Sequence, residues 1–192
     1  MTEENKLITE RKKKLEAIKL NNKTYPNTFR KKDYANNISD EYRDLEKEDI
    51  AEKNIPVSIA GRLLTIRNMG NSSFANLHDE SGNIQIYLQK KQVGEDSYAL
   101  FNNLDLGDIV GIEGVLFKTR TGELTINTSS IMLLSKSLRP LPEKFHGIAD
   151  IEIKYRQRYL DLMINPETKS LFKTRSKIVS QIRNFFIEDD YL

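Results

Sequence analysis

The sequence contains no cysteine among its 192 residues, so disulfide bonds and thiolate metal sites are excluded. Its two histidines, His78 and His146, lie far apart in the chain and predict no metal cluster. No run approaches the roughly 20 apolar residues that a membrane-spanning helix needs. The first five residues are polar and acidic, unlike a secretory signal. We therefore expect a cytoplasmic protein with no metal site and no membrane partner.

A large excess of basic charge is also missing. The 30 Lys and Arg residues are nearly balanced by 28 Asp and Glu residues, which leaves a net charge of +2. Counterion release would then supply little affinity for nucleic acid unless the basic residues are clustered. Two short basic clusters exist, at residues 11–14 and 30–32. For the first cluster we weigh two interpretations equally, a solvated helix face and a contact with phosphate groups.

Helices are predicted on both sides of the centre of the chain. Residues 3–20 have apolar side chains at helical spacing, and residues 39–53 predict a second, more polar helix. Residues 150–162 show helical spacing as well, and Asn165 and Pro166 then begin a last helix with a cap and a first-turn proline. The apolar stripe of this last helix consists of Leu171, Ile178, Ile182, Phe185 and Phe186. Little else could cover the stripe, so we expect the chain to be a segment of a longer protein.

The centre of the chain has the pattern of five short strands, with a helix at residues 94–104 between the third and the fourth. The predicted strands are residues 55–67, 73–79, 84–90, 108–118 and 123–127, and residues 131–134 extend the last one. This order is the layout of an OB-fold, a five-stranded Greek-key barrel. The predicted fold class is therefore mainly β with flanking helices (α+β).

The middle strands of this barrel have polar and aromatic side chains on one face. A side-chain period of two places Phe74, Gln85 and Tyr87 on the outer surface. The aliphatic residues that alternate with them, and that we expect in the core, are Ala75, Leu77, Ile84, Ile86 and Leu88. OB-folds bind oligonucleotides across strands two and three. An exposed ring there predicts a stacking platform for a base, and the alternative is a residue of the core or of a protein interface.

Three further side chains could read a base at this surface. The Gln85 amide offers both a hydrogen-bond donor and an acceptor. Glu123 has the same strand parity as Thr125, and its carboxylate can only accept hydrogen bonds. A carboxylate therefore suits the N3–H of uracil and repels the bare N3 of cytosine. Arg67 can donate to a uracil carbonyl, although it has the parity of Leu63 and the pattern does not fix its direction.

The sequence shows no catalytic apparatus. It has no phosphate-binding loop of the GxxxxGK[ST] form. Its glycines at 107, 111 and 114 fall within a predicted strand, where we interpret them as bends of the barrel. We find no nucleophile–base pair, so no catalytic residue is assigned and this chain alone is expected to be inactive.

Long stretches of the chain resemble class II lysyl-tRNA synthetases. The run PLPEKFHGIADIEIKYRQRYLDL, residues 140–162, resembles the hinge that follows the OB domain of that family. GRLLTIRNMGNSSFANLHDESGNIQIYL and DLGDIVGIEGVLFKTRTGELTI resemble its anticodon-binding domain, and RKKKLEAIKLNNKTYPNTFRK resembles its N-terminal helix and turn. RYLDL is shared with the aspartyl and asparaginyl relatives, whereas KFHG indicates the lysyl branch.

The resemblance implies a homodimeric enzyme that activates lysine with ATP and Mg2+ and transfers it to tRNA(Lys). It implies that Phe74 stacks on the central anticodon uridine, that Arg67 and Gln85 read that base, and that Glu123 contacts the neighbouring anticodon base. The C-terminal run TRSKIVSQIRNFFIEDDYL resembles the start of the family's first catalytic motif. Ligands for ATP, lysine and Mg2+ cannot be named within this chain.

The predicted organisation follows from these assignments. It comprises an N-terminal helical extension (1–54), an OB-fold anticodon-binding domain (55–138), a hinge (139–165) and the first helix of a truncated catalytic domain (166–192). The competing hypothesis is a non-catalytic OB-fold module that binds single-stranded nucleic acid or protein.

Overall fold

The computed structural model describes residues 3–21, 25–142 and 150–191. The chain divides into two compact units, Met1–Pro140 and Leu141–Leu192, and each unit is described by itself. The KFHG stretch at residues 144–147, which indicated the lysyl branch, lies outside the described residues. Among the helices of the described ranges, none has the length and hydropathy needed to cross a bilayer.

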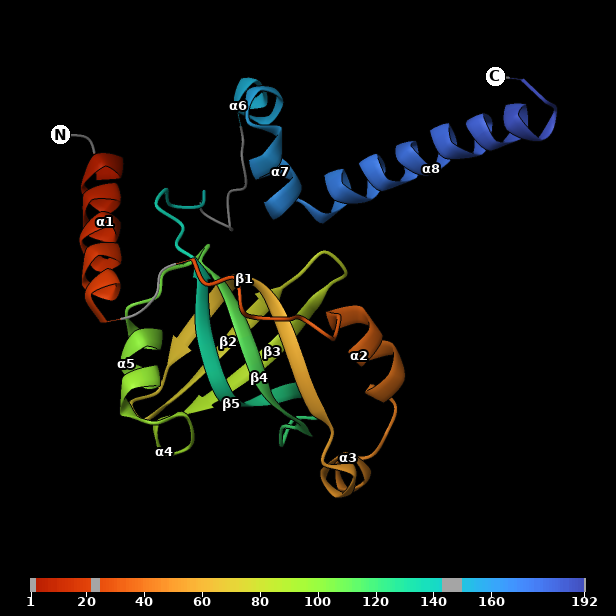
Figure 1. Cartoon of the computed structure of the whole chain (residues 1–192). Helices are drawn as coiled ribbons and strands as arrows, with labels where there is room; N and C mark the ends of the chain where they lie inside the picture. The colour runs from red at the N-terminus through yellow and green to blue at the C-terminus, as the bar shows by residue number, and fades with distance from the viewer. Residues whose placement is uncertain (1–2, 22–24, 143–149, 192) are drawn as a thin grey trace. The chain divides into compact units, whose positions relative to one another are not determined.

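A closed five-stranded barrel forms the centre of the first unit (Figure 1). The strand order around the barrel is β1-β2-β3-β5-β4, with β3 and β5 parallel and every other pair antiparallel. The strands are β1 (Pro56–Asn68), β2 (Ser72–His78), β3 (Asn83–Gln89), β4 (Ile109–Lys118) and β5 (Leu124–Ser135). The predicted OB-fold with flanking helices is confirmed, and β5 includes the predicted extension at residues 131–134.

The alternation predicted for the middle strands is confirmed. The aliphatic residues of β2 and β3 that are buried in the core are Ala75, Leu77, Ile84, Ile86 and Leu88. Phe74, Gln85 and Tyr87 alternate with them and are half-buried on the other face. Burying each leucine or isoleucine contributes roughly 1.5–3 kcal/mol. A slip of one residue would exchange the two faces, so this burial fixes which side chains reach the surface.

A β-bulge in β1 decides the direction of Arg67. The pairing of β1 with β2 shifts register between Leu63 and Thr65, which inserts one extra residue into β1. Beyond the bulge, Arg67 lies directly opposite Phe74. Opposite residues of an antiparallel pair share a face, and Arg67 is exposed. Arg67 therefore lies on the Phe74 face, although its sequence parity with the buried Leu63 left that direction open.

The single helix predicted for residues 39–53 is wrong, because two short helices occupy this region. The break between them is held by the barrel: Lys118 Nζ donates to the backbone carbonyl of Arg43 (2.7 Å) and to that of Leu45 (2.6 Å). These two backbone carbonyls therefore accept hydrogen bonds from a side chain of β4 and not from a continuing helix. The two helices are α2 (Ala35–Tyr42) and α3 (Lys47–Lys53).

The helix predicted for residues 94–104 is present, and a second, shorter helix that was not predicted precedes it. Gly94 has a φ of +85°, a conformation that favours glycine, and it ends one helix and precedes the next. The helix before Gly94 begins at Lys90, the last residue of the predicted third strand. The two helices are α4 (Lys90–Val93) and α5 (Glu95–Asn102).

Two of the three glycines that we interpreted as bends lie within β4, where neighbouring groups approach the backbone. A Cβ at Gly111 would lie 2.7 Å from the Phe29 ring, and one at Gly114 would meet the carbonyl oxygen of Asn127. Gly114 also lies at a register shift between β4 and β5. Gly107 differs from the prediction, since it precedes β4 in a turn with a φ of +100°.

The N-terminal helix is confirmed as α1 (Glu3–Asn21). Part of its basic cluster contacts the barrel unit: Lys14 Nζ lies 2.6 Å from the Asp105 carboxylate, and Arg11 donates to the Ser137 carbonyl at 2.9 Å. The two lysines between Arg11 and Lys14 are exposed. Half of the cluster therefore holds α1 in place, and half lies in solvent.

The hairpin that joins β2 and β3 is anchored by the buried carboxylate of Asp79. This carboxylate accepts hydrogen bonds from groups of the turn and of the N-terminal extension, namely Ser81, Gly82, Ala35 and Lys31. Burial alone would raise the pKa of Asp79, but these hydrogen bonds hold that pKa well below its usual range. The hairpin that positions Phe74 and Gln85 is therefore fixed at its turn.

The second unit is helical. The helix predicted for residues 150–162 is interrupted at Gln157, whose φ of −119° and ψ of 53° are not helical. The cap predicted at Asn165 is confirmed, since its Oδ1 accepts from the backbone N–H groups of Glu167 (3.1 Å) and Thr168 (3.5 Å). The helices are α6 (Ile151–Arg156), α7 (Arg158–Ile164) and α8 (Pro166–Glu188).

Candidate nucleic-acid interface

The outer face of the barrel has a row of three aromatic rings. The ring centroids of Phe74 (β2) and Tyr87 (β3) lie 4.5 Å apart at 31°, and those of Tyr87 and Phe117 (β4) lie 6.0 Å apart at 55°. Such separations are typical of favourable aromatic pairs. All three side chains are half-buried, so the row is held in place while part of its surface faces solvent. We call these three residues the aromatic row.

The amide of Gln85 is held at both ends beside the aromatic row. Its Nε2 donates to Glu123 Oε2 at 2.8 Å, and its Oε1 accepts from Thr125 Oγ1 at 2.9 Å. An amide has two N–H donors and two acceptor lone pairs, so one of each is left. The remaining donor and acceptor can pair with a base edge that places an acceptor next to a donor, such as O4 and N3–H of uracil.

The structure brings the four predicted site residues to one surface. Arg67 and Phe74 lie opposite each other on β1 and β2, Gln85 lies on β3, and Glu123 lies just before β5. Glu123 has a second role that its sequence position did not predict, since one of its oxygens orients Gln85. Its other oxygen can still accept a hydrogen bond from a ligand.

Two residues of this surface were missing from the predicted site. Thr125 is fully buried and holds Gln85, and Phe117 extends the aromatic row. Alternation within β4 and β5 places each residue on one of two faces. Strand pairing brings both residues to this site: Phe117 of β4 lies opposite Thr125 of β5, and Thr125 lies opposite Gln85 of β3.

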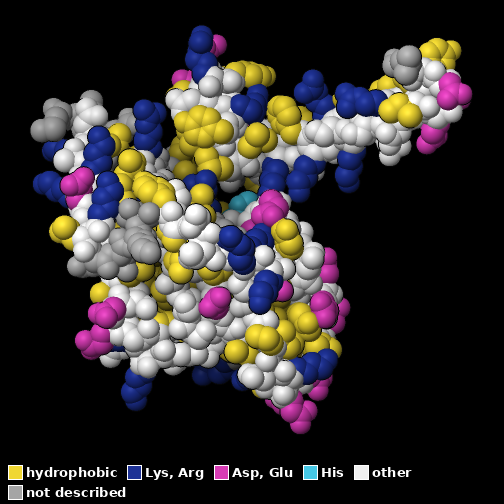
Figure 2. Space-filling model, viewed as in Figure 1, with side chains coloured by type: hydrophobic (Ala, Val, Ile, Leu, Met, Phe, Trp, Pro, Cys, Tyr) yellow, Lys and Arg dark blue, Asp and Glu magenta, His cyan; other side chains and the backbone are white. Residues whose placement is uncertain are grey.

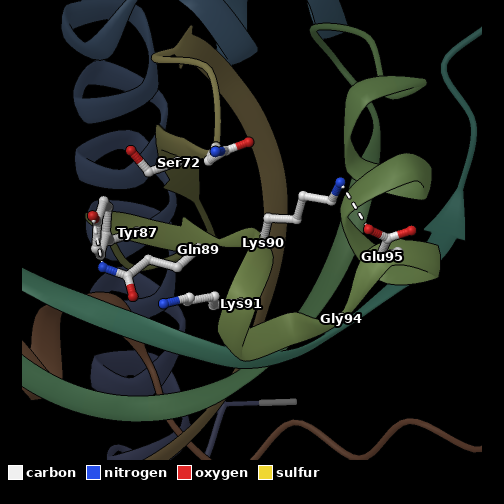
Figure 3. A pocket seen from close by; sticks show the side chains of 8 residues that line it. Ser72, Tyr87, Gln89, Lys90, Lys91, Gly94 and Glu95 are labelled. Atoms are coloured by element: carbon white, nitrogen blue, oxygen red, sulfur yellow. Dashed lines mark hydrogen bonds and ion pairs between the residues drawn. The ribbon is translucent and has the colours of Figure 1, made fainter.

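A pocket of about 690 Å³ adjoins the aromatic row at the end of β3 (Figure 3). It shares Tyr87 with the row and extends over the loop before β2 and over α4. The residues that line it are Asn71, Ser72, Tyr87, Gln89, Lys90, Lys91, Gly94 and Glu95.

The protein as a whole is close to neutral, with a net charge of +2. On the face that Figure 2 shows, Lys and Arg side chains are interspersed with Asp and Glu, in keeping with a net charge of +2. Within the described ranges, no group of three or more His, Asp or Glu side chains could hold a metal ion. The aromatic row and the Gln85 amide can offer a ligand stacking and hydrogen bonds.

Comparisons with known proteins found two family matches and a set of similar relatives. The family described as "OB-fold nucleic acid binding domain" matches residues 57–134, and "tRNA synthetases class II (D, K and N)" matches residues 150–192. Lysine–tRNA ligase of Chromobacterium violaceum is 47% identical to the chain over 190 residues, that of Thiobacillus denitrificans 49% and that of Methylobacillus flagellatus 48%. Each alignment covers 99% of this chain.

Over nearly its whole length the chain is similar to the N-terminal part of lysine–tRNA ligases. It spans 38% of the length of the C. violaceum and T. denitrificans enzymes and 37% of the M. flagellatus enzyme. The predicted resemblance is confirmed, and the match at residues 150–192 extends it beyond the barrel.

Proposed function

We propose that this chain is the tRNA anticodon-binding portion of a lysine–tRNA ligase. In full length, this ligase attaches lysine to tRNA(Lys) with ATP. One observation carries the proposal: a half-buried ring beside an amide held at both ends, on the outer face of an OB-fold barrel. OB-folds use this face for oligonucleotides, and the chain is similar to lysine–tRNA ligases over 99% of its length.

Each site residue has a role in the proposal. Phe74 stacks on the central anticodon uridine, an interaction worth about 1–3 kcal/mol. Gln85 pairs with the edge of that base through its remaining donor and acceptor, and Arg67, opposite Phe74, donates to a carbonyl of the base. Glu123 holds Gln85 with one oxygen and accepts from the neighbouring anticodon base with the other.

The remaining parts of the proposal concern the whole ligase. We infer a cytoplasmic homodimer that uses ATP and Mg2+, with residues 139–165 as the hinge and residues 166–192 as the first helix of the catalytic domain. The described residues of this chain offer no cluster of acidic groups that fits Mg2+. We therefore assign none of them to ATP, lysine or Mg2+, and we expect this chain alone to form no lysyl-tRNA.

A free-standing OB-fold module is the weaker alternative. A module of that kind needs no class II segment after its barrel, yet residues 150–192 match the class II family.

Titration of anticodon stem-loops tests the proposal. The wild-type chain should bind a UUU loop, and cytosine at the central position should weaken binding by about 1–3 kcal/mol, because a wrong base leaves polar groups unpaired. In a parallel arm, Glu123→Gln should reduce the preference for uracil at the neighbouring position, because an amide can also donate. Calorimetry measures both. Equal affinity of the wild type for every loop would contradict the proposal.

A further inference from the structure

We propose that the pocket beside the aromatic row binds the backbone phosphate of the nucleotide next to the stacked one, with Lys91 as its cationic ligand. The inference rests on the proposed function, since it assumes that a base stacks on Phe74. It adds a site for the RNA backbone, which none of the four predicted residues supplies.

The pocket continues the surface on which the base stacks. Phe74 pairs with Tyr87 across β2 and β3, and the next pair on the same face, Ser72 with Gln89, lines the pocket. Two residues along a strand correspond to about 7 Å. An RNA strand that leaves the Phe74 ring toward Ser72 therefore enters the pocket within one nucleotide.

The two lysines of the pocket point in different directions (Figure 3). Lys90 Nζ lies 2.9 Å from Glu95 Oε1, so a carboxylate already partners its charge. Lys91 extends toward the side of Gln89 and Tyr87. It is exposed and has no ion pair among the described residues. Lys91 is therefore the cation of the pocket that is available to a phosphate.

The neutral lining suits the sugar and phosphate of a nucleotide. Gln89 donates to the Tyr87 hydroxyl through Nε2 at 2.8 Å and retains a second N–H, and Asn71 and Ser72 add an amide and a hydroxyl. Side chains of this kind, together with lysine, make many of the contacts to phosphate and sugar in nucleic-acid complexes. A volume of about 690 Å³ leaves room for a sugar together with its phosphate.

Backbone hydrogen bonds fix the wall of the pocket. Lys90 N–H donates to the Asn71 carbonyl at 2.9 Å, and Met69 N–H donates to that of Ser72 at 2.8 Å. The hydroxyl of Tyr98 donates to the Gly70 carbonyl at 2.8 Å. The loop before β2 is thus tied to α4 and α5, and the pocket is formed before any ligand binds, which lowers the ordering cost of binding.

Removal of the Lys91 charge tests the inference. Lys91→Gln should weaken UUU and UCU stem-loops by the same factor, because a phosphate contact carries no base information. The ratio of wild-type to variant affinity should fall by about threefold between roughly 50 and 200 mM salt, the effect of one lost single-strand phosphate contact. As a control, Lys53→Gln on α3 removes the same charge at an exposed position outside the pocket. The ratio of wild-type to Lys53→Gln affinity should be the same at both salt concentrations.

A neutral methylphosphonate placed at each loop linkage in turn identifies the phosphate. At one linkage flanking the central uridine, the substitution should weaken the wild type several-fold and leave Lys91→Gln unaffected. Three results would overturn the phosphate site while leaving the proposed function intact. The affinity losses from Lys91→Gln and from the methylphosphonate could add at every linkage, or the salt dependence of Lys91→Gln could equal that of the wild type. The third is an affinity loss in Lys91→Gln that is confined to loops with one particular base. A wild type that binds no stem-loop would overturn both.

Discussion

Phe74→Ala is expected to weaken binding of a UUU anticodon stem-loop by about 1–3 kcal/mol, because the base loses its stacking partner. The Phe74 ring contacts Tyr87 at 4.5 Å between centroids, and it is only half-buried. Its loss should therefore affect binding more than it affects the free energy of unfolding. Calorimetric titration measures the first quantity, and urea denaturation measures the second.

Matched variants separate the ring from its apolar volume. Phe74→Leu keeps apolar bulk without a π face and should lose nearly as much affinity as Phe74→Ala. Phe74→Tyr keeps the ring and should bind the stem-loop close to the wild-type affinity. An alanine variant that is folded and binds normally would remove Phe74 from the proposed site.

Lys136→Met is expected to lower the free energy of unfolding by about 3–5 kcal/mol, since it leaves the buried carboxylate of Asp108 without its cation. Lys136 Nζ lies 2.5 Å from Asp105 Oδ2 and 2.6 Å from Asp108 Oδ2, and the side chains of Lys136 and Asp108 are fully buried. Burial alone would raise the pKa of Asp105, but hydrogen bonds from Lys136 and Lys14 hold that pKa below its usual value. Urea denaturation measures the loss.

The same carboxylate provides a control. Lys14 also pairs with Asp105, but 37% of its side chain is exposed, and exposed ion pairs contribute only about 0–1 kcal/mol. Lys14→Met should therefore have a much smaller effect than Lys136→Met. Equal losses for the two variants, or a loss below about 1 kcal/mol for Lys136→Met, would show that the buried cluster does not stabilise the barrel.

Local periodicity was sufficient to predict the middle of the site. Alternation placed Phe74 and Gln85 on the surface because aliphatic residues on both sides of them must be buried. Arg67 shows the limit of this reasoning: a bulge at residue 64 changes its face, and a bulge depends on pairing between strands. The contacts of Gln85 with Glu123 and Thr125 likewise depend on the parallel pairing of β3 with β5.

A helix prediction was wrong where tertiary contacts interrupt a continuous apolar pattern. The apolar spacing of residues 39–53 fits one helix, but Lys118 binds the carbonyls of Arg43 and Leu45 and stabilises a turn between two helices. The helix predicted from Gly94 is present as α5, which begins directly after Gly94, whereas the short helix α4 before Gly94 was not predicted. Lys90 and Lys91 lie on α4 and line the pocket that adjoins the aromatic row, which the sequence did not predict.

Photo-cross-linking measures most directly whether the outer face of β2 and β3 holds the anticodon. A UUU stem-loop with 4-thiouridine at its central position would be irradiated with the wild-type chain, and the adduct would be mapped by mass spectrometry. We expect the adduct within residues 67–89, on or next to Phe74 and Tyr87, and we expect competition by unmodified UUU loop. Adducts confined to α1 or to residues 141–192 would contradict the assignment of this surface.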